Sequence, residues 1–291
     1  MGLEEVYKGK SIAEVVGILG KWKGDAKIIA GGTDIIIDIR NGKASPKVLI
    51  DVSGIEELRA IKVKGELIEI GASVTFTQIV ESTLFQDNLY GLKKACHLVG
   101  SPQIRNKGTI GGNIANGSPA ADSIPPLICL NSTIILESLR GRREISLEKY
   151  YKDKIGYGIE EDELLVSIRF KKPTKTQVLS FSKLGLRKAL AISRISMATL
   201  LELDEERKVK TVEVASGSLG KYPMREPEVE AYLLNKFLNN KTIDEGVKVL
   251  QGVMAKRLEG RSTLPYKRIA VESMLKEALG DGLDFLNGVR A

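Results

Sequence analysis

Two glycine-rich segments constrain the fold of this chain more than any other feature of its sequence. The first, Ala30-Gly31-Gly32-Thr33-Asp34, follows a short apolar run at residues 27–29, and the second is TIGGNIANGSPAAD at residues 109–122. Glycine beside threonine or asparagine lets the backbone turn tightly and point its N–H groups toward an anion. If the first segment opens a helix, the helix N-terminus adds a positive partial charge. The pair therefore predicts two backbone segments that contact one diphosphate from two sides.

The common nucleotide-binding motifs match neither segment. There is no G-x-G-x-x-G of the Rossmann type and no P-loop ending in Gly-Lys-Ser/Thr. A phosphorylated ligand would therefore be held by a different architecture. Each segment alone could equally be an ordinary surface loop, and the Gly-Gly-polar pattern shared by both is what favours a common ligand.

Length and charge narrow the class of protein. The chain has 291 residues, of which 43% are hydrophobic, enough for one large domain or two ordinary ones. Its net charge is +7, but the basic residues are interspersed and aromatic residues make up only 5%. A nucleic-acid surface normally clusters its basic residues and interleaves them with aromatics. We therefore interpret the charge as a solvated surface and do not expect a nucleic-acid partner.

The cysteine and histidine content limits metal chemistry. Cys96 and Cys129 are far apart, and His97 is the only histidine. An iron–sulfur cluster needs about four thiolates, so this chain alone cannot hold one, and the same residues make no zinc site. Lone cysteines in apolar segments are typical small core residues of a reducing compartment. With no apolar leader and no apolar window of membrane-spanning length, we expect a soluble, cytoplasmic protein, and its Ile, Lys and Glu content is typical of a thermophile.

The first sixty residues predict a small mixed layer. Ser11 and Glu14 form a capping-box pattern ahead of apolar residues at helical spacing. The run of β-branched isoleucines after Asp34 weakens the helical signal there without removing it. A βαβ-type layer is therefore expected. Its order is a strand at residues 27–29, a helix at 35–40 with Thr33 or Asp34 as its N-cap, and a strand at 48–52.

From about Leu58 the pattern changes to strands joined by turns, with a long stretch rich in glycine, proline and asparagine at residues 100–121. Pro173, in lysine- and threonine-rich surroundings, marks a domain boundary. Beyond it strands come first and helices afterwards, the order of a separate α+β unit. The expected strands lie at 60–63, 67–71, 133–138, 143–146, 164–170, 178–184, 191–203 and 209–218, and the expected helices at 75–81, 91–99, 122–130, 228–239, 242–254 and 265–279.

The two glycine segments carry a family resemblance. AGGTD followed by RNKGTIGGNIANGSPAAD resembles the FAD-binding, or medium, subunit of the molybdenum hydroxylases, which include carbon monoxide dehydrogenase, xanthine dehydrogenase and aldehyde oxidoreductase. The similarity covers the whole chain and continues through residues 163–168, 181–184 and 261–268. It implies an α+β fold: an FAD-binding domain of the vanillyl-alcohol-oxidase (PCMH) type at residues 1–175, with subdomains at about 1–57 and 58–175. A smaller C-terminal domain at 176–291 would combine an antiparallel sheet with a helical bundle.

The resemblance also implies residue roles. Residues 28–35 would wrap the diphosphate of FAD, and residues 109–113 would contact it from the other side. Asp122 would bond a cofactor hydroxyl, Leu165 would touch the adenosine or the ring region, and Lys183 would lie near the isoalloxazine, with residues 99–101 beside the ring. The cofactor-binding set is Ile28, Ile29, Ala30, Gly31, Gly32, Thr33, Asp34, Ile35, Val99, Thr109, Ile110, Gly111, Gly112, Asn113, Asp122, Leu165 and Lys183.

The implied function is electron transfer. A large subunit with a molybdenum–pterin cofactor would oxidise an aldehyde, a heterocycle or carbon monoxide. A small subunit with [2Fe–2S] clusters would pass the electrons to FAD on this chain. The three chains would form a heterotrimer or a dimer of heterotrimers. No catalytic residue and no metal site are expected here. The terminal electron acceptor could be NAD, quinone, ferredoxin or oxygen, and the sequence does not distinguish these. The alternative is a self-sufficient FAD oxidoreductase, which would need an acid or base over the flavin that we do not identify. A third hypothesis is an interaction protein without a cofactor.

Three single residues need separate treatment. His97 could anchor FAD covalently, but the resembling subunits bind FAD noncovalently, so we interpret it as a structural residue of the helix at 91–99. Arg105 could pair with phosphate or hold the second glycine segment, and the sequence does not decide between these. Trp22, the single tryptophan, is expected to pack at the end of the first helix.

Overall fold

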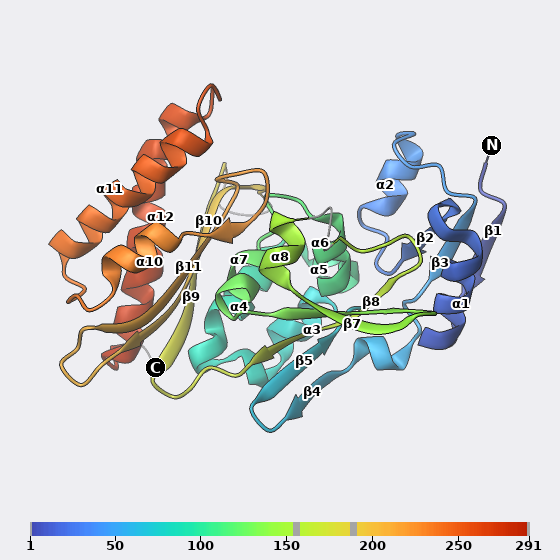
Figure 1. The fold of residues 1–291 in the computed structure, drawn as a ribbon, viewed down its shortest axis with the longest axis horizontal. Coiled ribbons are helices and arrows are strands. Elements are labelled where there is room, and N and C mark those ends of the chain that lie inside the picture. The colour runs from blue at the N-terminus through green and yellow to red at the C-terminus, as the bar shows by residue number, and fades with distance from the viewer. Residues whose placement is uncertain (1, 154–157, 187–190, 290–291) are drawn as a thin grey trace. The chain divides into compact units, whose positions relative to one another are not determined.

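The computed structural model describes residues 2–153, 158–186 and 191–289. It divides into two compact units whose segments alternate along the chain (Figure 1). The N-terminal unit comprises Met1–Ile79, Ser101–Gly117 and Ser132–Lys171. The C-terminal unit comprises Val80–Gly100, Ser118–Asn131 and Lys172–Ala291. The domain limits expected from the sequence follow chain order and stay a prediction.

A three-stranded parallel sheet opens the N-terminal unit, in the order β1-β3-β2. Helix α1 is capped by the hydroxyl of Ser11, which accepts from the N–H of Glu14, as the capping-box pattern predicts. The βαβ-type layer is confirmed, because β2, α2 and β3 follow one another and the two strands are parallel. The elements are β1 (Glu5–Lys8), α1 (Ile12–Trp22), η1 (Lys23–Asp25), β2 (Ala26–Ile29), α2 (Ile35–Arg40), β3 (Val48–Asp51) and η2 (Glu56–Arg59).

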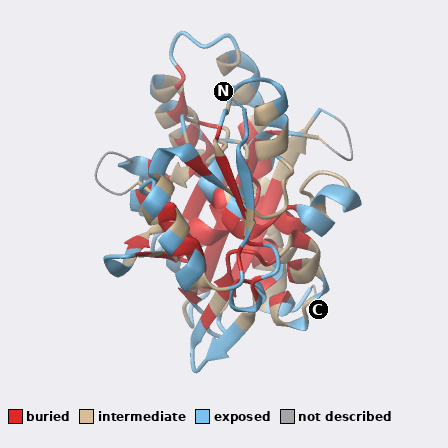
Figure 2. Cartoon of the chain, turned by 90° about the vertical axis from the view of Figure 1, so that its right-hand side faces the viewer, coloured by how far each residue is buried: buried red, intermediate tan, exposed pale blue. Residues whose placement is uncertain are grey.

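A five-stranded antiparallel sheet forms the rest of this unit, in the order β4-β5-β8-β6-β7. Val15 and Leu19 of α1 pack with Val48 of the parallel sheet and Val166 of the larger one, so a single core joins both sheets. Figure 2 shows buried positions running along the strands and exposed ones at the loops and outer helix faces. The elements are β4 (Ile61–Lys64), β5 (Leu67–Gly71), α3 (Phe76–Glu81), β6 (Thr133–Ser138), β7 (Gly141–Ser146), α8 (Leu147–Lys152) and β8 (Leu164–Lys171).

The glycine-rich stretch at residues 100–121 contains two short helices, α5 (Pro102–Lys107) and α6 (Ile110–Asn116). The sequence predicted no helix within residues 100–121, and that prediction is wrong. The hydroxyl of Ser101 accepts from the N–H of Ile104, and Thr109 caps α6 in the same way. These caps outweigh the low helix propensity of the two glycines in α6.

The C-terminal unit is built on an antiparallel sheet of order β12-β11-β10-β9, covered on one face by α10, α11 and α12 and on the other by α4 and α7 (Figure 1). The inner faces of α11 and α12 share a core with Ile195, Met197 and Leu201 of β10. Beyond Lys172 the strands precede the helices, as expected, whereas α4 and α7 come from segments ahead of the sheet in the chain. The elements are η3 (Thr83–Phe85), η4 (Asp87–Leu89), α4 (Tyr90–His97), α7 (Ile124–Cys129), β9 (Gln177–Gly185), β10 (Ser193–Leu203), β11 (Val209–Gly217), β12 (Met224–Arg225), α10 (Pro227–Leu233), α11 (Asn240–Arg257) and α12 (Leu264–Leu286).

Helix α10 is shorter than its sequence predicts. It ends at Leu233 instead of Asn239, because Asn235 takes a left-handed conformation with φ of 62° and Phe237 forms a β-bridge with Lys208. The buried interior confirms the interpretation of the cysteines: Cys96 and Cys129 are both fully buried with free thiols. Among the described helices, none has the length and apolar character needed to cross a bilayer.

Candidate cofactor-binding site

The first glycine segment forms a tight turn between β2 and α2. Gly32 lies in the left-handed region with φ of +70°, and a Cβ on Gly31 would come within 1.9 Å of the carbonyl oxygen of Lys107. Glycine is therefore required at Gly31 by a close backbone contact and favoured at Gly32 by conformation. In the described part of the chain no hydrogen-bond acceptor is assigned to the N–H groups of Gly31, Gly32 and Thr33. Successive free N–H groups of this kind are suited to an anion such as a diphosphate.

The second glycine segment is packed differently. Thr109 is buried, and its hydroxyl accepts from the N–H of Gly112 at 3.1 Å. The N–H groups of Ile110 and Gly111 donate to the carbonyls of Val74 and Ala72, and the N–H of Asn113 donates to the carbonyl of Thr109. The expectation that this segment turns its N–H groups toward an anion is therefore not met. What it offers a ligand is the Thr109 hydroxyl and the surface of the half-buried Asn113.

The structure brings the two segments together within the N-terminal unit. The main chain of Gly31 lies directly against Lys107 and Gly108. The carboxylate of Asp34 accepts from the side-chain amide of Asn116 at 3.2 Å and from the hydroxyl of Thr33 at 2.9 Å. The predicted pairing of the segments is therefore present. Its side-chain link through Asn116 had no sequence signal beyond its position in the second segment.

The remaining predicted residues of this unit flank the first glycine segment, except Leu165, which lies on β8. Ile28 and Ile29 lie on β2 and pair with Ile50 and Asp51 of β3, Ala30 follows, and Ile35 opens α2. Asp34 occupies the N-cap position of α2, but its side chain makes no capping hydrogen bond. Leu165 is buried on β8, on the face opposite to Leu164 and Val166, which belong to the core around α1.

Substitution of Thr109, the N-cap of α6, tests whether this cap stabilises the second glycine segment. Thr109→Ala should lower the free energy of unfolding by about 1 kcal/mol, because the N–H of Gly112 loses its acceptor. Thr109→Ser keeps the hydroxyl and should retain the stability. Urea unfolding of both variants, followed by circular dichroism, checks this. Equal losses for alanine and serine would mean that the threonine methyl group, and not the cap, stabilises the segment.

Three predicted residues of the C-terminal unit meet around one buried ion pair. The ammonium of Lys183 on β9 lies 2.5 Å from Oδ2 of Asp122, and the side chains are 8% and 6% exposed. The same ammonium donates to the carbonyl of Leu98 at 2.8 Å, directly before Val99. The hydroxyl of Ser193 on β10 donates to Oδ1 of Asp122. Lys183 thus holds the segment at residues 98–100 and Asp122 together.

This network sets the ionisation of Asp122. Burial raises the pKa of the Asp122 carboxyl above its ordinary value, while Lys183 and Ser193 act in the opposite direction by favouring the carboxylate. Each carboxylate oxygen keeps a lone pair beyond the hydrogen bond it already accepts, so Asp122 could still accept from a ligand hydroxyl. Ser193 and the Leu98 carbonyl were not identified from the sequence, because one lies inside an expected strand and the other is a main-chain atom.

The single residues weighed from the sequence have clear positions. His97 is the last residue of α4 and is exposed, so it is not packed into that unit's core. Trp22 packs against the core around α1, as expected. Arg105 lies on α5, half-buried, in the segment that contacts Gly31, and its role stays a prediction.

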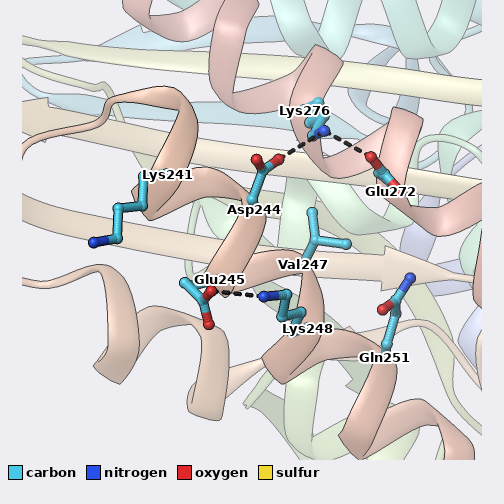
Figure 3. A pocket seen from close by; sticks show the side chains of 8 residues that line it. All are labelled: Lys241, Asp244, Glu245, Val247, Lys248, Gln251, Glu272 and Lys276. Carbon is cyan, nitrogen blue, oxygen red and sulfur yellow. Dashed lines mark hydrogen bonds and ion pairs between the residues drawn. The ribbon is translucent and has the colours of Figure 1, made fainter.

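A separate open groove of about 450 Å³ lies along α11 and α12 (Figure 3). Lys276 pairs with Asp244 at 2.7 Å and with Glu272 at 2.6 Å, and Lys248 pairs with Glu245 at 2.7 Å. Its charged groups thus largely neutralise one another. None of the predicted cofactor residues lines this groove, so we assign it no part in cofactor binding.

Comparison with known proteins decides the family. Residues 3–173 match the family described as the FAD-binding domain in molybdopterin dehydrogenase, and residues 180–281 match the C-terminal domain of the CO dehydrogenase flavoprotein. The chain belongs to the FAD-binding subunits of the molybdenum hydroxylases. It is accordingly a subunit of an FAD-dependent oxidoreductase, and FAD is its cofactor. The α+β fold expected from the resemblance is confirmed.

Individual relatives span nearly the whole chain. The nicotinate dehydrogenase FAD-subunit of Eubacterium barkeri is 34% identical over 98% of this chain and 97% of its own length. The xanthine dehydrogenase FAD-binding subunit of Escherichia coli O157:H7 is 29% identical over 97% of each. A chain of the carbon monoxide dehydrogenase of Hydrogenophaga pseudoflava superposes with a TM-score of 0.88 at 28% identity, covering 97% of this chain and 98% of that one. FAD-binding subunits that serve different substrates therefore share this fold.

The residues of the N-terminal unit fit the cofactor of this family. The turn at Gly31 has three successive N–H groups with no acceptor among the described residues, and it has no room for a side chain, which suits close approach of a diphosphate. The Thr109 hydroxyl lies in the neighbouring segment. Donors of this kind hold a diphosphate without a metal ligand from the protein, and the described residues contain no cluster of His, Cys, Asp and Glu that could bind a metal.

Proposed function

We propose that this chain is the electron-transfer subunit of a molybdenum-containing oxidoreductase, receiving electrons from [2Fe–2S] clusters of a small partner subunit and delivering them through FAD to a terminal acceptor. The observation that carries the proposal is the turn at Gly31. Its N–H groups have no acceptor among the described residues, and its main chain packs against Lys107 and Gly108 at the start of the second glycine segment. Such a turn is suited to FAD, and the family supplies the redox role. FAD contributes the chemistry of accepting electrons singly and releasing two.

The chain's own residues bind and orient the cofactor in this proposal. The N–H groups of Gly31, Gly32 and Thr33 donate to the diphosphate. The Asp34 carboxylate, already bonded to Thr33 and Asn116, keeps the turn in place and is not itself a phosphate ligand. Residues 109–113 contact the diphosphate through the Thr109 hydroxyl, with Ile110, Gly111 and Gly112 as packed backbone.

In the C-terminal unit, Asp122 accepts from a cofactor hydroxyl, and Val99 and Lys183 lie beside the ring. Leu165 contacts the adenosine or the ring region. The support for Asp122 and Lys183 is that they are joined to each other and to Leu98 in one buried network. No residue of this chain has to act as a general acid or base, because the flavin itself accepts and releases the electrons.

The complex would contain two further kinds of chain. A large subunit with a molybdenum–pterin cofactor oxidises the organic substrate or carbon monoxide, and a small subunit carries the clusters, in a heterotrimer that can pair into a dimer. Relatives named as medium chains and FAD-subunits support this division of labour. We also propose a cytoplasmic location, which the two free cysteines support. The proposed domains are residues 1–175, with subdomains at 1–57 and 58–175, and residues 176–291.

An absorption spectrum tests the cofactor assignment. The chain, expressed alone and incubated with FAD before desalting, should show flavin bands, and acid denaturation should release the flavin. His97→Ala should bind FAD as the parent does, because His97 is not expected to form a bond to it. Flavin retained on the denatured parent but not on His97→Ala would establish a covalent anchor. Absence of flavin both from the chain and from the complex purified with its partners would refute the proposal.

A further inference from the structure

The motif at residues 261–268, ahead of and within α12, has no part in the cofactor site described above. Its Lys267 is half-buried, and the ammonium donates to the carbonyl of Ser218. Ser218 follows β11 in the left-handed region with φ of 62°, and its N–H donates to the carbonyl of Pro119 at 2.7 Å. Among the residues that the structure describes, the Lys267 ammonium is therefore held by a main-chain carbonyl and not by a carboxylate.

Two more cations lie near Lys267. Burial lowers the pKa of Lys267, and the charges of Arg194, at the start of β10, and Arg261, ahead of α12, lower it further. Both arginines are exposed. Within residues 2–153, 158–186 and 191–289, neither arginine has an ion-pair partner, and nor does Lys267. Three cations gathered without a counter-charge repel one another, and a bound anion would remove that repulsion.

Hydrogen bonds connect this cluster to the buried network of Asp122. The hydroxyl of Ser218 donates to the carbonyl of Ser193 at 3.0 Å, and the hydroxyl of Ser193 donates to Asp122. Arg194 is the residue after Ser193 on the same strand. Three successive hydrogen bonds thus join Lys267, through Ser218 and Ser193, to Asp122, which the proposed function places at the cofactor.

We propose that Arg194, Arg261 and Lys267 form a binding site for the diphosphate group of a soluble compound. Guanidinium groups bind phosphate oxygens in pairs of parallel hydrogen bonds, and the lysine adds a point charge. The diphosphate has two sources: a dinucleotide that accepts electrons from the flavin, or a free nucleoside diphosphate that binds without accepting them. The first source rests on the proposed function, whereas the site itself does not.

Isothermal titration with inorganic pyrophosphate, at about 0.1 M salt and on the chain incubated with FAD and desalted, tests the site. The affinity should fall at least about tenfold in the double variant Arg194→Gln/Arg261→Gln, because two charge-assisted contacts are lost. Both arginines are exposed, so the variant should fold. Arg142→Gln is the matched control: it removes an equally exposed arginine, paired with Glu137 on a different sheet, and should bind pyrophosphate as the parent does. No binding by the parent, or equal binding by the double variant, overturns the proposal.

The flavin content of the same samples separates this test from the proposed function. A chain that lacks flavin but binds pyrophosphate through the arginines would refute the flavin role and leave the anion site standing. The source is decided on the purified complex with NAD⁺ and an uncharged quinone as acceptors. If the ratio of the KM for NAD⁺ to the KM for the quinone rises in the double variant, the site is assigned to a dinucleotide acceptor. An unchanged ratio, with pyrophosphate affinity still lost, assigns it to a free diphosphate.

Discussion

Replacing Gly31 with alanine is expected to weaken FAD binding by about ten- to a hundredfold, the loss expected when one or two hydrogen bonds to a charged group are disturbed. The added Cβ would lie 1.9 Å from the carbonyl oxygen of Lys107 and 2.5 Å from its carbonyl carbon. Both are main-chain atoms, so no side chain can rotate to make room. The turn must move away from the second glycine segment, and its N–H groups then no longer converge on one position.

The same clash should lower the free energy of unfolding by roughly 2–4 kcal/mol, in the range of severe overpacking. Gly17→Ala is the matched control, because Gly17 lies within α1 with nothing within 4 Å of a Cβ. It should stabilise the chain by about 0.5–1 kcal/mol, since alanine is the better helix former. Urea unfolding and an FAD titration measure both effects. Full FAD affinity in Gly31→Ala would mean that the diphosphate is not held by this turn.

The order of elements followed from the sequence wherever a periodic pattern was complete. The capping box at Ser11, the strand at residues 67–71 and helix α11 are found close to their predicted positions, whereas α12 begins where predicted and continues to Leu286 instead of ending at Leu279. Each combines a burial pattern with a local start or stop signal, and both act through nearest neighbours. The parallel pairing of β2 and β3 also followed, because a helix connects them.

The glycine-rich stretch shows why other elements could not be predicted. Glycine and asparagine argue against a helix, yet α6 forms because Thr109 caps it and Gly111 packs directly against Ala72. Close packing to a distant residue leaves no local trace in the sequence. The same holds for residues 80–100 and 118–131, which pack with the C-terminal unit although they precede its sheet in the chain.

The sequence resemblance implied which residues bind the cofactor, and that assignment stays a prediction. The structure packs Gly31 against Lys107 and Gly108, directly before Thr109, and it pairs Asp122 with Lys183. The sequence did not indicate that the N–H groups of Ile110 and Gly111 are already bonded, because their acceptors, the carbonyls of Val74 and Ala72, come from a separate segment. A glycine pattern reports what the backbone can do, whereas the acceptors that compete for its donors depend on tertiary structure.

Removing the charge of Lys183 from its buried pair with Asp122 is expected to cause a second large loss of stability. Lys183→Met should destabilise the chain by about 3–5 kcal/mol near neutral pH, because among the described residues it leaves the buried carboxylate of Asp122 bonded only to Ser193. It also removes the donor to the Leu98 carbonyl. Lys276→Met is the matched control: Lys276 contacts two carboxylates as well, but its side chain is 41% exposed. That loss should stay within about 1 kcal/mol.

The pH dependence of Lys183→Met distinguishes a buried charge from a simple loss of packing. Burial raises the pKa of Asp122 in the folded chain, and the variant lacks the ammonium that opposes this. A carboxyl with a raised folded pKa contributes most to stability below its unfolded pKa, and the contribution disappears as the pH rises through the folded value. The stability deficit of the variant relative to the parent should therefore be smallest in acid and grow as the pH is raised. Urea unfolding at about pH 5 and about pH 8 measures the two deficits, and equal deficits would mean that Lys183 acts through its packing and not through its charge.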